Sequence, residues 1–471
     1  MNPSVPTLGR SVPTLERVEE GACCAACGGQ QAAQPPDGSS PPKVAPRPEL
    51  TVLQPARPTI VRGTDRRITF GGVLAAAGLL GTAGLSAIMA RPGGTAWLPL
   101  HLALGGAAGT AIAAVLPFFT AALAQVGPAH PALRIASIGL VGGGSVLAAL
   151  GMNGGTATMA ATGGILYLGG LLALTGSAFL PLRAAIGSRL RLVHLAYAAA
   201  LAQVGVGVTL ATAMLAGWSP VTGAWLSLKP AHAWLNVFGF VTLVVAASLL
   251  HLAPTVAGSR IIPRRSATIA IGALMIGAPL VALGFGLRSD IFGRTGALVE
   301  LVGAVALFGH AAVVRRDRGS WTSDLGWHRF AGLSLLAAPA WVLVAVIIGA
   351  GRILWLGATP EAWSVGPLAV PLVAGGIGQV LVGSWTHIVA AIGPGAQAAH
   401  AVQRRLLGRA ATPRWLAWNA GAFLATAGAL IGADALATAG AALLGSSLLT
   451  ALFLLAVSVT ISPWRARAVA V

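Results

Sequence analysis

The fold predicted for this chain depends most on residues Lys229 to Arg265, whose sequence is KPAHAWLNVFGFVTLVVAASLLHLAPTVAGSRIIPRR. It contains one long apolar run with a histidine near each end, His232 and His251, nineteen positions apart. At the rise of an α-helix this separation is about 28 Å, close to the roughly 30 Å thickness of the hydrocarbon core of a bilayer. We therefore expect a membrane-spanning helix whose two histidines face opposite sides of the membrane and cannot bind the same metal ion.

The composition is typical of a multi-pass membrane protein. Of the 471 residues, 56% are hydrophobic and only 9% are charged, whereas soluble domains carry about 25% charged residues. Apolar runs of about twenty residues recur, so we expect an all-α bundle of about twelve transmembrane helices. The expected spans are residues 68–90, 97–124, 132–151, 155–181, 192–216, 230–256, 266–287, 295–314, 328–350, 366–392, 415–433 and 436–461.

The net charge of +18 follows from 30 Lys and Arg against 12 Asp and Glu. The basic residues lie in short loops between apolar runs, which indicates membrane topology and argues against a nucleic-acid partner. If both termini are cytoplasmic, 25 of these 30 basic residues lie inside, as the positive-inside rule requires. The five basic residues that are then predicted on the outer side are Arg91, Lys229, Arg288, Arg294 and Arg352. We expect a plasma-membrane protein whose main partner is the lipid bilayer.

Two terminal tails flank the expected transmembrane domain of residues 68–462. Residues 1–67 are rich in Pro, Gly, Ser and charge, and are predicted to be a disordered cytoplasmic tail. The segment 463–471 is predicted to be a short basic tail. The motif CCAAC in the first tail supplies three thiols within five residues, which can chelate a soft metal or form a redox pair. These thiols belong to Cys23, Cys24 and Cys27.

Ionisable side chains inside a membrane are costly and mark candidate sites. His101 and His232 lie at similar distances into spans two and six, which run in the same direction, so the two imidazoles are predicted at matching depth. Paired imidazoles from two helices are typical ligands of haem or copper. Glu300 is predicted in the same outer half, and Asn236 can fix the tautomer of His232. Alternatively, each histidine bonds a neighbouring helix.

A second group of histidines is predicted near the inner membrane face. These five side chains could line a second metal site or a proton path, or could simply occupy hydrated helix ends. The group comprises His194, His251, His310, His328 and His387. No nucleotide-binding, hydrolase or metalloprotease motif occurs in a suitable context. A similarity between SLLHLAP, in span six, and SWTHIVA, in span ten, favours two related halves.

Three motifs resemble those of the haem–copper-oxidase-like membrane proteins, a group that includes the NnrS proteins linked to nitric-oxide metabolism. They are WLPLHLALGG at 97–106, HAWLNVFGF at 232–240 with HLAPT at 251–255, and GGIGQVLVG at 375–383. The chain also resembles an actinobacterial membrane module found fused to cupredoxin domains of nitrite-reductase type. The resemblance implies haem b or copper at His101 and His232, extending to His251 and His387, and a cupredoxin or other redox partner on a separate chain.

The departures from the family pattern argue against a complete oxygen- or nitric-oxide-reducing centre. Trp234 replaces the second histidine of the family's H-x-H motif, and span seven contains no histidine. We therefore expect electron transfer, a nitrogen-oxide response or copper handling instead of catalysis. Two other functions stay open. One is a cofactor-free proton-coupled transporter in which the histidines and Glu300 relay protons, and the other is a structural or assembly subunit.

Overall fold

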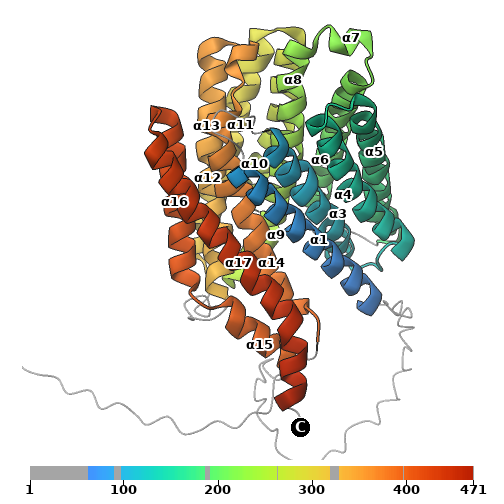
Figure 1. The fold of residues 1–471 in the computed structure, drawn as a ribbon, viewed down its shortest axis with the longest axis vertical. Helices are drawn as coiled ribbons and strands as arrows, with labels where there is room; N and C mark the ends of the chain where they lie inside the picture. Colours follow the sequence, from blue (N-terminus) through green and yellow to red (C-terminus); the bar gives the residue numbers. More distant parts are fainter. Residues whose placement is uncertain are drawn as a thin grey trace, which may run out of the picture. The chain divides into compact units, whose positions relative to one another are not determined.

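A computed structural model describes residues 62–89, 97–185, 191–262, 264–318, 328–395 and 397–469. The chain divides into two units, Met1–Ala56 and Arg57–Val471, and all described residues lie in the second. Every regular element in the described residues is a helix, which confirms the all-α prediction (Figure 1). The predicted thiol cluster of Cys23, Cys24 and Cys27 lies outside the described residues.

Eleven helical segments in the described part of the chain are long and apolar enough to cross a membrane. Eight are single helices: α1 (Arg62–Met89), α4 (Pro131–Asn153), α5 (Ala157–Phe179), α6 (Arg191–Leu215), α10 (Arg265–Leu287), α11 (Asp290–Arg316), α12 (His328–Leu356) and α17 (Asp434–Val469). The expected eleventh span is also a helix, α16 (Ala411–Ile431), but Arg414 and Asn419 make it less apolar than the others. We number the spans one to twelve in chain order and count α16 as span eleven.

Several helices extend four to six residues beyond their predicted bounds, among them α11, α12 and α16, and further differences occur at the ends of the domain and in one connection. Helix α1 begins at Arg62, inside the predicted tail, and α17 continues to Val469, through most of the segment predicted as a basic tail. A short helix, α15 (Gln397–Leu407), lies between spans ten and eleven. The two hairpins predicted to be the shortest turn at Gly155 and Gly432, both at φ 70°, a conformation that favours glycine, while the connection from α10 to α11 is also only two residues long.

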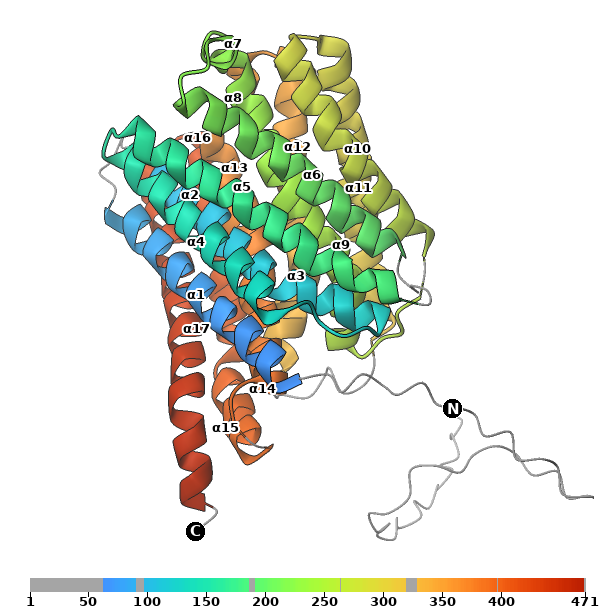
Figure 2. The ribbon, with the colours of Figure 1, turned by 90° about the vertical axis from the view of Figure 1, so that its right-hand side faces the viewer.

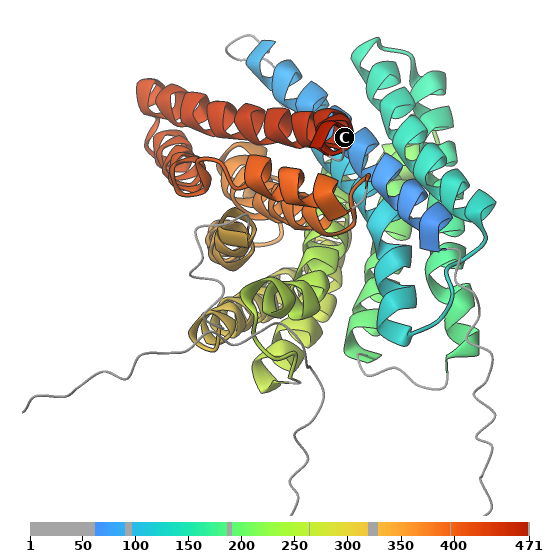
Figure 3. The same ribbon diagram turned by 90° about the horizontal axis from the view of Figure 1, so that it is seen from below.

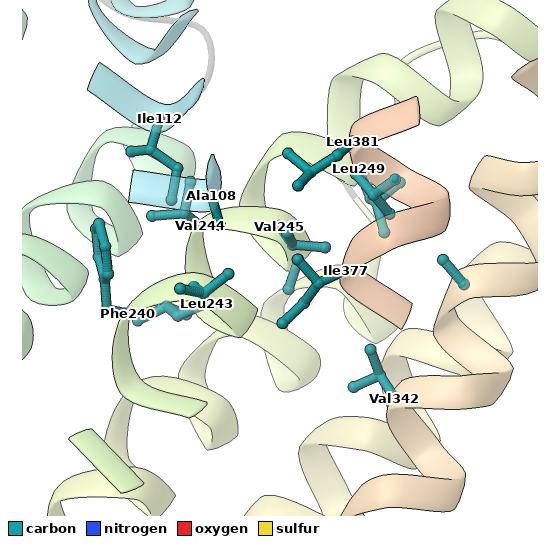
Figure 4. Packing of buried hydrophobic residues seen from close by; sticks show 14 of the residues in the cluster. Ala108, Ile112, Phe240, Leu243, Val244, Val245, Leu249, Val342, Ile377 and Leu381 are labelled. Carbon is teal, nitrogen blue, oxygen red and sulfur yellow. The ribbon is translucent and has the colours of Figure 1, made fainter. Parts of the chain in front are cut away.

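Spans two, six and ten are interrupted by π-helical turns and form the centre of the bundle. Their buried shares, 72%, 83% and 65%, are the largest of all the spans. Figure 4 shows Val244 and Val245 of span six between Ala108 of span two and Ile377 of span ten. The segments are α2 (Trp97–His101), η1 (Leu102–Ala108) and α3 (Gly109–Ala124); α8 (Trp225–Trp234), η3 (Leu235–Thr242) and α9 (Leu243–Ala257); and α13 (Val365–Leu368), η6 (Ala369–Gly378) and α14 (Gln379–Ile392).

A four-span unit occurs three times, which corrects the expectation of two related halves. Spans three, seven and eleven each contain a glycine that packs closely against the following helix. A Cβ atom at Gly144 would lie 2.6 Å from the backbone nitrogen of Tyr167. The same distance would be 2.9 Å from Gly277 to Glu300 and 2.7 Å from Gly421 to Leu444. The first two of these glycines are 133 residues apart, as are the starts of η1 and η3 and the residues Tyr167 and Glu300. The repeat can be followed by the spacing of these glycines, because close contact between helix backbones is the feature that the three units have in common.

The repeats arrange the spans in three arcs around the central helices (Figures 2 and 3). The first arc runs from η1 through α4, α5 and α6 to η3, with each helix packed on the next. The second arc runs from η3 through α10, α11 and α12 to η6. The third runs from η6 through α16, α17 and α1 back to η1, and Figure 3 shows α1 between α17 and the α4–α5 pair. Each arc can therefore enclose a site between two central helices.

Candidate functional site

A cavity of about 470 Å³ occupies the first arc and extends to the start of span ten. Its walls are mostly apolar, and its volume lies within the range of about 300–1,000 Å³ that is typical of cofactor and ligand sites. Histidines from two central helices, His101 and His232, both line it, which agrees with their predicted common depth. The other polar residues on its wall include Ser145, Tyr167, Thr212, Lys229 and Asn236.

His101 is held in one tautomer by its own helix. It is the last residue of α2 and directly precedes the π-helical segment η1. Its Nδ1 lies 2.8 Å from the carbonyl oxygen of Trp97, one turn earlier, so Nδ1–H is the donor. The indole of Trp97 stacks on the imidazole at 3.9 Å between ring centroids. Because Nδ1 carries the proton, Nε2 has a lone pair available as a ligand.

His232 has the same tautomer, although its hydrogen bond reaches a different helix. Its Nδ1 lies 2.7 Å from the carbonyl oxygen of Gly207 in α6, and 2.9 Å from the side-chain amide of Asn236. Since Nδ1–H donates to Gly207, the Asn236 amide fits best when its oxygen, which otherwise has no partner, turns toward the ring. The Asn236 amide also lies 3.4 Å from Nε2 of His232, so it contacts both ring nitrogens and fits its predicted role of orienting this imidazole.

Tyr167 of α5 contributes a phenol to the wall of the cavity and is 6% exposed. Its hydroxyl oxygen lies 2.5 Å from the point where a Cβ atom of Gly109 would be, so only glycine leaves room for it. No hydrogen bond from this hydroxyl to another described residue is formed. A rigid, buried phenol without a protein partner is thus available to a ligand. Sequence reasoning missed Tyr167 because tyrosine is common in apolar helices and carries no motif.

The donor set fits a haem better than a bare metal ion. Two neutral imidazoles on the wall of one large apolar cavity are the ligands that a six-coordinate haem uses. The exposed ammonium of Lys229 lies on the same wall and could pair with an anionic substituent. Across the described residues, no group of three or more histidine, cysteine, aspartate or glutamate side chains is placed to hold a metal ion. The cavity therefore suits a largely apolar cofactor that His101 and His232 would hold through their ring nitrogens.

The equivalent part of the second arc is filled by side chains. Trp234, which lies 133 residues after His101, donates a hydrogen bond from Nε1 to Glu300 Oε2 at 2.8 Å. Glu300 is fully buried, and Trp234 is 1% exposed and stacks on Phe238 at 4.6 Å. Neither Trp234 nor Glu300 lines the cavity of the first arc. Glu300, which was predicted in the same outer half as these two histidines and as a cofactor-binding residue, bonds Trp234 in the second arc and does not border the cavity.

The inner histidines also lie apart from the cavity. The rings of His328 and His387 face each other with centroids 6.0 Å apart, and His251 meets Phe119 edge to face at 4.8 Å. His310 lies 3.4 Å from the hydroxyl of Ser266. His251 and His387, which the family resemblance associates with metal binding, are therefore not part of the site formed by His101 and His232.

Comparisons with known proteins support the fold. No protein-family model matches the sequence, and no curated protein matches it either. Among solved structures, the chain is similar to a heme-copper terminal oxidase whose dimer was determined by cryo-electron microscopy. The TM-score is 0.61 with 13% sequence identity, over 85% of this chain and 84% of the oxidase chain. The chain is thus a multi-pass helical membrane protein with a fold of the haem–copper oxidase type.

Proposed function

We propose that this protein binds one haem b in the first-arc cavity, where His101 and His232 would hold it, and that it transfers electrons. The observation that carries the proposal is the shared tautomer of these two residues. Each Nδ1 is bonded to a backbone carbonyl, so each Nε2 is unprotonated, and both imidazoles line the same cavity. Histidines whose role is only to link two helices through hydrogen bonds do not need to line one large apolar cavity.

Several features of the cavity have a defined role in this proposal. Trp97 and the Gly207 carbonyl hold the two imidazoles in the orientation that a metal ligand needs. The apolar walls exclude water, and Lys229 would neutralise a carboxylate of the cofactor. When bound, a haem with two imidazole ligands exchanges single electrons and has no open coordination position. That property favours electron transfer over catalysis.

The cellular role follows the same line of argument. Electron transfer needs a donor and an acceptor, so a separate cupredoxin or other redox protein at the plasma membrane is the expected partner. The sequence motifs similar to those of NnrS proteins favour a role in the response to nitrogen oxides. Copper, the alternative to haem at His101 and His232, is less favoured because a single ion does not need a cavity of about 470 Å³.

The test is to purify the protein and measure its absorption spectrum and its iron content. We expect one haem per chain, with a Soret band that shifts on reduction and is lost in His101→Ala and in His232→Ala. In His232→Gly, imidazole added to the buffer should restore the band. His130→Ala, in an exposed loop, is the control. Full haem content in both alanine variants, or a folded wild-type protein without haem, would contradict the proposal and favour the cofactor-free transporter.

A further inference from the structure

An open groove of about 600 Å³ lies on the lipid-facing side of the bundle, where α1 packs beside α4 (Figure 2). Its rims include Ala75 and Gly78 of α1 and Gly139 and Gly143 of α4, all of which are exposed. Thr110 of α3 lines the groove from the centre of the bundle, and no lining residue is charged. The groove therefore suits an uncharged, mostly apolar occupant that reaches it from within the membrane.

The two equivalent junctions between neighbouring arcs are closed by a polar side chain. Where α6 meets α10, Gln203 donates a hydrogen bond from Nε2 to the carbonyl oxygen of Met275 at 3.3 Å. Where α12 meets α16, Trp341 donates from Nε1 to Asn419 Oδ1 at 2.8 Å. Met275 and Asn419 each lie two residues before the repeat glycine of their helix, and the residue at this position in α4 is Gly142, which lines the groove. In the described part of the chain, no side-chain hydrogen bond joins α1 to α4 at this level, so the third junction is left open.

The hydroxyl of Thr110 is the polar group that an occupant of the groove would meet. Thr110 is 1% exposed, and its Oγ1 forms no hydrogen bond to another described residue. A Cβ atom at Gly142 would lie 3.1 Å from this oxygen, so the glycine leaves the hydroxyl open to the groove. A buried hydroxyl without a partner costs free energy, and the bilayer core contains no water to supply one. We therefore expect the occupant to bring a hydrogen-bonding group to Thr110.

The glycines on the rims of the groove are not required by packing inside the chain. A Cβ atom at Gly78, Gly139 or Gly143 would meet nothing within 4 Å, in contrast to the repeat glycine Gly144. Glycine in the middle of a helix costs about 0.5–1 kcal/mol relative to alanine, so three such residues on an exposed face need another reason. Gly139 and Gly143 have the G-x-x-x-G spacing through which membrane helices approach each other closely. These glycines therefore indicate contact with a helix outside the chain.

A second copy of this chain meets all of these requirements. Thr110 is thirteen residues, or about 20 Å, into span two, where lipid head groups do not reach and lipid tails offer no hydrogen-bonding group. A two-fold axis along the membrane normal brings residues of equal depth together, so Gly139 and Gly143 would face the same glycines of the other copy. Ile135 and Leu150, which flank these glycines on α4, are exposed and extend the apolar contact.

We propose that two copies of this chain form a dimer in which α4 of each copy lies in the α1–α4 groove of the other. The Thr110 hydroxyl donates to a backbone carbonyl oxygen of the helix that enters, because serine and threonine hydroxyls form such bonds between membrane helices. The contact lies on a different face from the haem cavity, whose lining includes neither Thr110, Gly139 nor Gly143. It is therefore independent of the proposed cofactor.

The test is to measure the mass of the purified full-length protein in lipid nanodiscs and by native mass spectrometry, and its dissociation constant by dilution into lipid vesicles. We expect two chains per particle. Gly139→Leu and Gly143→Leu place a bulky side chain where the helices would meet, so each should weaken the dimer by about tenfold or more. Thr110→Val keeps the shape and removes the hydroxyl, for which we expect a loss of about threefold. With Cys23, Cys24 and Cys27 replaced by serine, Gly143→Cys should form a disulfide between copies in native membranes.

Gly272→Leu is the matched control, because Gly272 lies 133 residues after Gly139 and a Cβ atom there also meets nothing within 4 Å. That variant should dimerise like the parent. A monomeric parent protein in nanodiscs, or a dimer unchanged in both Gly139→Leu and Gly143→Leu, would overturn the proposal. So would a single chain that carries a lipid adduct lost in these variants, which would assign the groove to a lipid. Haem content and melting temperature should equal those of the parent in Gly139→Leu and Gly143→Leu, which shows that each variant is folded.

Discussion

The first and second arcs have the same backbone plan but differ in what fills them. In the first arc, His101 and Tyr167 border a cavity of about 470 Å³. In the second arc the equivalent residues, 133 positions later, are Trp234 and Glu300, which bond to each other at 2.8 Å. In the second arc a hydrogen-bonded indole and carboxyl group lie where an imidazole and a phenol border the cavity in the first arc. The two arcs therefore place different side chains at equivalent positions of the same backbone plan.

The second and third arcs each contain a buried tryptophan whose indole N–H is hydrogen-bonded. In the third arc, Trp418 of α16 donates a hydrogen bond from Nε1 to the carbonyl of Ala374 at 3.0 Å and is 2% exposed. The equivalent position in the first arc, three residues before Gly144, is Val141. Because buried polar groups in a membrane need partners, each filling indole is accompanied by an acceptor for its N–H. In the first arc the tryptophans Trp97, Trp225 and Trp363 line the cavity and leave it open.

The largest expected effect comes from emptying the second arc. Trp234→Ala removes a fully buried indole and leaves Glu300 without its donor, so we expect a loss of about 3–5 kcal/mol in the free energy of unfolding. Trp234→Phe retains most of the volume and removes only the hydrogen bond, for which we expect about 1–3 kcal/mol. Unfolding in mixed detergent and dodecyl sulfate micelles measures both. Equal effects of the two variants would show that the indole volume does not support this arc.

The converse change fills the first arc. His101→Trp places at position 101 the residue found at the equivalent position in the second arc. It removes one ligand and takes up part of the cavity, so haem affinity is expected to fall by more than about 100-fold, since changes to the partners of a ligand alone cost 10–100-fold. Haem titration followed at the Soret band measures the affinity. His101→Gln removes the ligand without adding an indole, and an apolar dye should bind that variant more tightly than His101→Trp.

A third prediction tests the repeat itself. Gly144→Ala, Gly277→Ala and Gly421→Ala each introduce a Cβ within 3 Å of the backbone of the next helix. Overpacking of this kind costs about 1–3 kcal/mol, and all three variants should lose similar stability. Gly143→Ala and Gly272→Ala have no atom within 4 Å of the new Cβ and serve as controls. A loss in only one of the three repeats would contradict the structural equivalence.

Much of this architecture could be predicted from the sequence, because hydropathy and length determine where a chain can cross a bilayer. Span two was expected at residues 97–124, and α2, η1 and α3 together cover Trp97–Ala124. Depth also follows from position along a span, and His101 and His232, which were predicted at matching depth, line the same cavity. The direction in which a side chain points around its helix does not follow from depth. The sequence therefore did not indicate that Glu300 bonds Trp234 and does not border this cavity.

The threefold repeat was missed for a related reason. Its signal is not a shared motif but the spacing of glycines, such as Gly144, Gly151 and Gly163 in the first unit and Gly277, Gly284 and Gly296 in the second. In a chain with 63 glycines, such spacings are found in many places and have little weight alone. They become informative when the same separation of 133 residues recurs at every one of them. Aligning the sequence with itself at that separation would also have paired His101 with Trp234.

The smallest expected effect concerns Tyr167, the counterpart of Glu300. Tyr167→Phe removes a hydroxyl that bonds no described residue, so the free energy of unfolding should change by less than about 1 kcal/mol. If the hydroxyl donates to the bound cofactor, haem affinity should fall by up to about tenfold, which corresponds to roughly 1.4 kcal/mol. The Soret position and reduction potential should shift in the same variant. Glu300→Gln, in the filled arc, is the matched control, because its amide oxygen can still accept from Trp234 and it does not border the cavity. A shift in the spectrum of Glu300→Gln as large as that of Tyr167→Phe would mean that the two arcs are not independent, and that the filled arc also affects the cofactor site.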